Sequence, residues 1–187
     1  TFGGNRYLGQ PKLDGSALSL EYVAGNLHRA ATRGSGERGE DVTLNAKLVA
    51  NVPLRLNVAV DCHVRGEVVM PLATFEEKYR EISPNPRNLC SGALRQKHGD
   101  GKADASDLIF QAYDVKFPKE SPDIQNDSEL LSWLQDAGIE PAPWTIFESE
   151  EPQKEMIEFT QEWGTKRASY KFEIDGIVFK LDNLSQR

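Results

Sequence analysis

The chain has few cysteines and no long apolar run. Its 187 residues include only Cys62 and Cys90, 28 positions apart, without a Cys-x-x-Cys pair or a nearby pair of histidines. This spacing gives no support for a zinc site and favours two free, buried thiols in a reducing compartment. No stretch approaches the roughly 18 apolar residues of a membrane span, and the first residues lack the features of a signal peptide. We therefore expect a cytoplasmic protein with no membrane partner.

Histidine is also scarce, and the acidic charge is unevenly spread. His28, His63 and His98 are scattered, and none has a serine or cysteine at a spacing that suggests a catalytic triad. Residues 1–116 carry 15 Lys/Arg and 14 Asp/Glu, a net charge of +1, whereas residues 117–187 carry 7 and 15, a net charge of −8. The first part therefore keeps a nearly neutral, locally basic surface, which permits contact with nucleic acid.

The hydrophobic pattern predicts strands that arrive as hairpins between helices. With 39% hydrophobic residues, a chain of this length can bury a core of one domain or slightly more. Alternation and turn residues predict strands, and 3.6-residue periodicity predicts helices. The strands are expected at 18–22, 27–33, 64–70, 108–115 and 176–181, and the helices at 41–50, 74–81, from Asn85-Pro86, from about Asp127, and at 152–163. Such an order favours an α+β fold with mainly antiparallel sheets.

The segment Pro11-Lys12-Leu13-Asp14-Gly15 is the strongest chemical motif. A lysine becomes a nucleophile only as the free amine, so burial or a neighbouring cation must favour its deprotonation. The glycine allows backbone to approach a ligand, and the aspartate can orient the ammonium group or a metal ion. Taken alone the motif is short, and a solvated turn is the better explanation of it.

Further blocks follow this motif in a fixed order. They are Ala31-Thr32-Arg33-Gly34, Arg65-Gly66-Glu67, the stretch from Asn85-Pro86-Arg87-Asn88 to Arg95-Gln96, and Glu173-Ile174-Asp175-Gly176 running to Lys180. Together they resemble the adenylation (nucleotidyltransferase) domain of bacterial-type NAD-dependent DNA ligases, from about Gln10 to Arg187. The resemblance implies an ATP-grasp-like nucleotidyltransferase fold, in which antiparallel sheets cradle a nucleotide between outer helices.

The resemblance also implies roles for individual residues. Lys12 would form a phosphoramide with AMP, with Asp14 steering Lys12 or a metal ion. Glu67 would bind the ribose, Lys180 would bind a phosphate, and Asp175 would bind metal or the attacking hydroxyl. Mg²⁺ would be held by the carboxylates of Asp14, Glu67 and Asp175.

Other positions carry weaker expectations. Arg33, beside a glycine-rich loop, suits an anion contact. Arg87 and Arg95 share one face of a helix and suit phosphates of DNA or of AMP. Tyr113 is expected near the adenine. Gln10 stands where the family usually has glutamate, and its amide can still accept a hydrogen bond from the adenine amino group, without the charge.

The expected protein is the adenylation core of an NAD-dependent DNA ligase, acting with NAD and Mg²⁺ on nicked double-stranded DNA. We expect residues 1–187 to form this one domain as a monomer. By resemblance, the chain ends before the family's last motif and lacks its NMN-binding, OB-fold, zinc-finger, helix-hairpin-helix and BRCT parts. Two alternatives remain: a catalytically impaired module that binds nucleotide or a partner, and an ATP-dependent relative among the nucleic-acid ligases.

Overall fold

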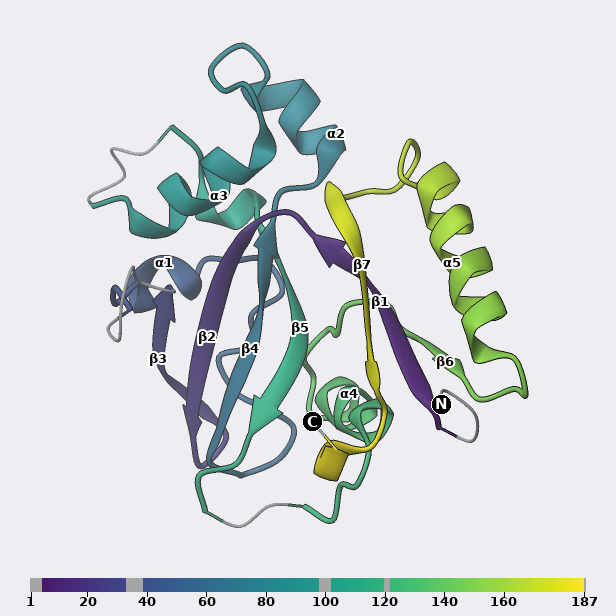
Figure 1. Ribbon diagram of the computed structural model, residues 1–187. Helices are drawn as coiled ribbons and strands as arrows, with labels where there is room; N and C mark the ends of the chain where they lie inside the picture. The colour runs from purple at the N-terminus through teal and green to yellow at the C-terminus, as the bar shows by residue number, and fades with distance from the viewer. Residues whose placement is uncertain (1–4, 33–38, 98–101, 120–121, 187) are drawn as a thin grey trace.

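Two antiparallel sheets form the framework of the computed structural model (Figure 1). The structure describes residues 5–32, 39–97, 102–119 and 122–186. A four-stranded sheet has the order β3-β2-β4-β5, and a three-stranded sheet has the order β6-β1-β7. The strands are β1 (Tyr7–Leu13), β2 (Ser16–Val23), β3 (Asn26–Thr32), β4 (Cys62–Val69), β5 (Ile109–Lys116), β6 (Thr145–Phe147) and β7 (Ile174–Leu181).

Helices lie around these sheets. Figure 1 shows α1 and α3 beside the four-stranded sheet, α4 near the end of β7, and α5 outside the three-stranded sheet. The helices are α1 (Thr43–Ala46), α2 (Leu72–Thr74), α3 (Pro86–Arg95), α4 (Asp127–Asp136) and α5 (Pro152–Lys166). Short turns complete the set: the π-helical η1 (Phe75–Tyr79) and the 3₁₀ turns η2 (Ala105–Asp107) and η3 (Leu184–Gln186). The expected α+β architecture with antiparallel pairing is confirmed.

The chain passes from one sheet to the other at Asp14 and Gly15. β1 belongs to the three-stranded sheet and β2 to the four-stranded sheet. A Cβ atom at Gly15 would lie 2.1 Å from the carbonyl oxygen of Val68, so only glycine fits this crossing. The crossing therefore holds the Lys12 end of β1 where the two sheets meet.

Alternation along β4 separates the core from the pocket face. Val64, Val68 and Met70 are fully buried, whereas Arg65 is exposed and Glu67 is half-buried. The predicted face of Glu67 is therefore confirmed. One large core joins the four-stranded sheet to α3 and α4, and a smaller one lies under α5 around Trp163 and Phe172.

Two helices begin at the capping residues that the sequence offers. The Asn85 side chain accepts a hydrogen bond from the Asn88 amide at 3.0 Å, and Pro86 opens α3. Asn126 and Glu129 form a reciprocal capping box at the start of α4. Gly138, with φ of 92°, follows the end of α4.

Two other helix predictions are wrong in extent. The helix expected at 41–50 is regular only over α1. The Leu48 and Val49 amides bond to carbonyls three residues back, and the Ala50 amide bonds to the Leu108 carbonyl. The helix expected at 74–81 begins earlier, as α2, and continues as η1, where Phe75 and Tyr79 are both buried.

Both cysteines are free and buried, as expected. Burial raises the pKa of the Cys62 thiol to about 11 and that of Cys90 to about 12. Such thiols are poor nucleophiles near neutral pH. No helix in the described part of the chain is long and apolar enough to cross a membrane.

Candidate functional site

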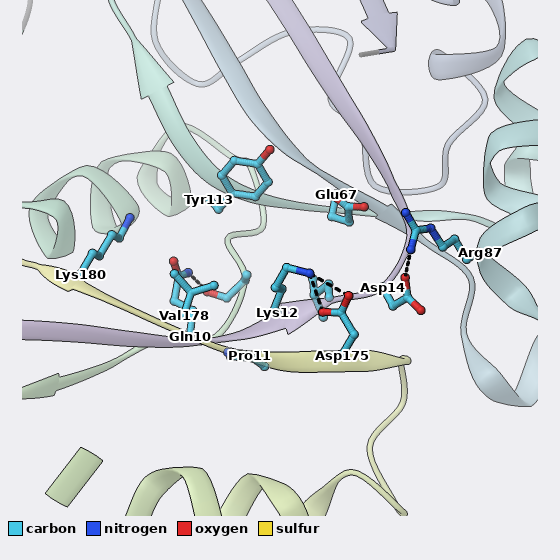
Figure 2. Close-up of a pocket in the computed structure, with 12 residues that line it drawn as sticks. Gln10, Pro11, Lys12, Asp14, Glu67, Arg87, Tyr113, Asp175, Val178 and Lys180 are labelled. Carbon is cyan, nitrogen blue, oxygen red and sulfur yellow. Dashed lines mark hydrogen bonds and ion pairs between the residues drawn. The ribbon is translucent and has the colours of Figure 1, made fainter. Parts of the chain in front are cut away.

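A pocket of about 360 Å³ collects most of the predicted site residues (Figure 2). Its walls come from β1 and β7 on one side and from β4, β5 and α3 on the other. The residues that line it are Gln10, Pro11, Lys12, Leu13, Asp14, Glu67, Arg87, Tyr113, Ala142, Asp175, Val178 and Lys180. Segments from positions 10 to 180 therefore meet in one place.

Lys12 and Asp175 face each other because the β1–β7 ladder is irregular. Lys12 pairs with Gly176 and Leu13 pairs with Ile174, which leaves Asp175 as the extra residue of a β-bulge. The Lys12 Nζ atom lies 2.8 Å and 2.7 Å from the two carboxylate oxygens of Asp175. Both side chains are partly open to solvent, with exposed fractions of 55% and 36%.

Asp14 forms an ion pair with Arg87. Its carboxylate lies 3.1 Å from an Arg87 guanidinium nitrogen, and Figure 2 shows this pair beside that of Lys12. The group that contacts Lys12 is therefore Asp175, while Asp14 joins the crossing between sheets to α3. Two adjacent ion pairs, each of one carboxylate and one cation, line this end of the pocket.

Glu67 reaches the same end from β4. Burial raises the pKa of Glu67 to about 7, although a hydrogen bond from the Gly15 amide and the charges of Arg87 and Lys12 act in the opposite direction. Perturbation of this kind in a pocket is typical of functional carboxyl groups. Near neutral pH this side chain can therefore donate or accept a hydrogen bond.

The other end of the pocket is formed around Gln10. Gln10 is buried, and its amide nitrogen donates to the Ala142 carbonyl at 3.3 Å, which leaves the amide oxygen to face the pocket (Figure 2). Across the pocket lies the ring of Tyr113, with Val178 on the side of β7. Tyr113 and Val178 keep 36% and 41% of their surface exposed. The Tyr113 ring therefore offers an exposed, flat surface to this end of the pocket.

Lys180 lies at the Gln10 end and not beside Lys12. Lys180 pairs with Leu8 in the β1–β7 ladder, whereas Lys12 pairs with Gly176. Lys180 and Gly176 are four positions apart on β7, about 13 Å along the strand. The Lys180 Nζ atom is 2.8 Å from a carboxylate oxygen of Asp127, the fully buried first residue of α4. Burial lowers the pKa of Lys180, while the carboxylates of Asp114 and Asp182 raise it.

Of the remaining basic candidates, only Arg95 belongs to the described part of the chain, and it lies elsewhere. Arg95 is outside the pocket, where its guanidinium lies 3.2 Å from Glu40. Arg33 belongs to residues 33–38, outside the described part of the chain. Of the two arginines expected on one helical face, only Arg87 therefore reaches the pocket.

The three carboxylates named for Mg²⁺ do not form a protein cage. No group of three or more His, Cys, Asp or Glu side chains placed to hold a metal ion occurs within the described residues. Asp14 and Asp175 nevertheless line the same pocket. Because Mg²⁺ binds readily through one or two carboxylates together with waters and substrate phosphates, this arrangement fits an ion that arrives with a nucleotide.

Sequence reasoning missed two groups that hold pocket side chains in place. The carbonyl of Ala142 is a backbone group with no side-chain signal. Asp127 resembles an ordinary acidic residue in the first turn of a helix, where negative charge is generally favourable. Only the placement of α4, which packs on β5 and bonds through its first turn to Asp182 after β7, brings it to Lys180.

Comparison with known proteins identifies the family of this chain. Residues 3–187 match the family model of the NAD-dependent DNA ligase adenylation domain. The chain is 38% identical over 191 residues to a DNA ligase of Natranaerobius thermophilus, covering 97% of this chain, and 40% identical over 188 residues to one of Magnetococcus marinus, covering 95%. A solved archaeal ATP-dependent RNA ligase shares the fold, with a TM-score of 0.57 and 15% identity, covering 96% of this chain and 40% of that one.

The fold is thus that of the nucleotidyltransferase-type ligases. The chain belongs to the family of NAD-dependent DNA ligase adenylation domains, which are catalytic domains of ligases. It spans about a quarter of the length of these two relatives, 28% and 24%.

Proposed function

We propose that this chain forms a covalent lysyl-AMP intermediate at Lys12, with NAD as the AMP donor. The observation that carries the proposal is the convergence of Lys12, Asp175, Glu67, Gln10 and Tyr113 on one pocket. This set supplies an attacking amine, groups for phosphate and ribose, and a flat slot for the base. The family to which the chain belongs supports NAD over ATP as the donor.

In the proposed reaction the Lys12 amine attacks the phosphorus of the AMP half of NAD. A nitrogen–phosphorus bond forms, the bond to the bridging oxygen breaks, and nicotinamide mononucleotide leaves with that oxygen. The ammonium group must first lose a proton, and Asp175 is the carboxylate in contact with it. Asp14 and Asp175 would hold Mg²⁺ in the pocket, where the ion would supply positive charge for the phosphates.

The Gln10 end of the pocket suits adenine. We infer that the base lies between Tyr113 and Val178, where the Gln10 amide oxygen accepts from the adenine amino group. Lys180 stands at this same end, so we assign it to the base and not to a phosphate. An acceptor and a donor side by side complement the amino group and the adjacent ring nitrogen of adenine.

Glu67 is assigned to a ribose hydroxyl, and Arg87 to a phosphate of AMP or DNA. In the parent protein the AMP group would then pass to the 5′-phosphate of nicked duplex DNA, followed by attack of the 3′-hydroxyl. We propose that the protein acts as a monomer on such DNA in the cytoplasm.

Mass spectrometry of the intact protein tests the proposal. Incubation with NAD and Mg²⁺ should add one AMP, whereas ATP and Mg²⁺ should add none. Lys12→Ala should abolish the adduct. Lys154→Ala, which changes an exposed lysine of α5, should keep it.

The same mass-spectrometric assay is applied to this chain and to the longest protein that its gene encodes. An adduct that survives Lys12→Ala, or one that forms only from ATP, contradicts the proposal. If neither protein forms an adduct, the module that binds nucleotide or a partner is the better explanation.

A further inference from the structure

One ion pair at the pocket joins a buried carboxylate to a pocket lysine. Asp127 is fully buried, and its side chain lies 2.8 Å from Lys180 Nζ, which retains 23% exposure. The pairs of Lys12 with Asp175 and of Arg87 with Asp14 are both more exposed. Because a buried carboxylate requires a partner, Asp127 restricts where the Lys180 ammonium group can lie.

The backbone around Asp127 is also tied to the end of β7. The Asp127 amide donates to the Asp182 carbonyl at 2.6 Å, and the Ser128 amide and hydroxyl donate to the Asp182 carboxylate at 2.7 and 2.8 Å. Arg6 lies 2.8 Å from the same carboxylate. The start of α4 therefore has a fixed position relative to Lys180, two residues before Asp182.

We propose that Asp127 is a positioning residue that holds the Lys180 ammonium group, charged and oriented, at the base end of the nucleotide pocket. This inference rests on the proposed nucleotide-binding function of the pocket. Asp127 does not line the pocket, so it acts on a nucleotide only through Lys180. Without it, Lys180 would keep its place on β7 and lose the direction of its side chain.

The charges around Lys180 set the expected effect of removing Asp127. Asp127 faces it from α4 at 2.8 Å. Asp114 of β5 and Asp182 after β7 favour its ammonium form. Arg65 is paired with Asp114 and Arg6 with Asp182, so each cation reduces the influence of its carboxylate. Burial favours the neutral amine. Loss of Asp127 should therefore lower the pKa of Lys180 further.

The experiment compares Asp127→Asn with the unchanged protein and with Asp136→Asn, an exposed carboxylate at the other end of α4. The side-chain ¹³C resonance of Lys180 is followed against pH, and NAD binding is measured by calorimetry. We expect Asp127→Asn to move the Lys180 titration to lower pH and to weaken NAD binding about tenfold, as for a lost charged hydrogen bond. In Asp136→Asn both should be unchanged.

Two outcomes overturn the inference. One is a Lys180 titration at the same pH in Asp127→Asn as in the unchanged protein. The other concerns NAD binding. If Asp127→Asn weakens NAD binding equally in the unchanged protein and in a Lys180→Met background, Asp127 acts independently of Lys180.

A variant that fails to fold does not prevent the test. Lys180→Arg keeps the charge at all accessible pH values. We expect it to abolish the loss of NAD binding that the unchanged protein shows as pH rises through the Lys180 titration. Persistence of that loss contradicts the inference. If the unchanged protein binds no NAD, the proposed function fails, whereas the Lys180 titration still decides whether Asp127 acts on Lys180.

Discussion

The two ends of the pocket differ in how firmly their charged groups are held. At the Lys12 end, two ion pairs are partly open to solvent, and Lys12 and Arg87 keep 55% and 61% of their side-chain surface exposed. At the Gln10 end, Gln10 and Asp127 are buried, and Lys180 is 23% exposed. The Lys12 end can therefore rearrange cheaply, whereas the other end is organised before a ligand arrives.

This difference suits the two tasks that adenylation requires. A base is recognised by fixed donors and acceptors, which cost little reorganisation on binding. A nucleophile must release its proton and leave its partner, and an exposed pair permits this because such pairs contribute little net stability. We infer that the pocket separates recognition from chemistry along the length of β1.

The largest effect is expected from Lys12→Arg, which tests the chemical end alone. Arginine keeps the positive charge beside Asp175 but stays protonated, so it cannot attack phosphorus. We expect complete loss of the AMP adduct while NAD binding persists, measured by mass spectrometry and calorimetry. Lys166→Arg, on α5, provides the control. An adduct on the Lys12→Arg protein would mean that another residue is the nucleophile.

The next largest effect is expected on the free energy of unfolding when each of the two lysine ion pairs is broken. Lys180→Met leaves the buried Asp127 without its cation and should cost about 3 kcal/mol or more of the free energy of unfolding. Lys12→Met breaks an exposed pair and should cost less than about 1 kcal/mol. Urea unfolding measures both. Adding Asp127→Asn to Lys180→Met should recover part of the loss. Equal losses of unfolding free energy in Lys180→Met and Lys12→Met would contradict the contrast between the two ends of the pocket.

A smaller effect, dependent on pH, is expected from Glu67→Gln. The folded-state pKa of about 7 lies above the ordinary value, 4.5, so the folded protein keeps a proton that the unfolded chain has released between about pH 4.5 and 7. Stability therefore falls as pH rises through this window, by up to about 3 kcal/mol. Glu67→Gln should remove this fall, and its advantage in urea unfolding should be larger at pH 8 than at pH 5. Parallel stability curves would contradict the raised pKa.

The sequence predicted the parts of this pocket that depend on local pattern. Asn85 before Pro86 indicated where α3 begins, and alternation along β4 placed Glu67 off the core. Both predictions need only the chemistry of neighbouring residues. The other site residues were predicted from the family resemblance and not from local pattern. Long stretches of sequence separate its blocks, and no local pattern describes how these stretches fold.

The remaining features depend on contacts between distant segments. Strand parity places Asp175 on the face opposite Lys180, and only the bulge opposite Lys12 turns it into the pocket. Within the helix expected at 41–50, the Ala50 amide instead bonds to the carbonyl of Leu108, 58 positions later. The pairing of Asp127 with Lys180 spans 53 positions and requires the packed position of α4. None of these contacts leaves a signal in the adjacent sequence.

The smallest effect is expected from Arg95→Ala, which lies outside both ends of the pocket. Its exposed pair with Glu40 should contribute less than about 1 kcal/mol to stability, and the AMP adduct should form as before. If Arg95 contacts a phosphate of nicked DNA, its loss should reduce the slope of log affinity against log salt by about one. Fluorescence anisotropy with a nicked duplex at several salt concentrations measures this slope. An unchanged salt slope in Arg95→Ala would mean that other residues make the contacts with DNA. Arg87→Ala, in contrast, should lower the yield of the AMP adduct, because Arg87 lines the pocket.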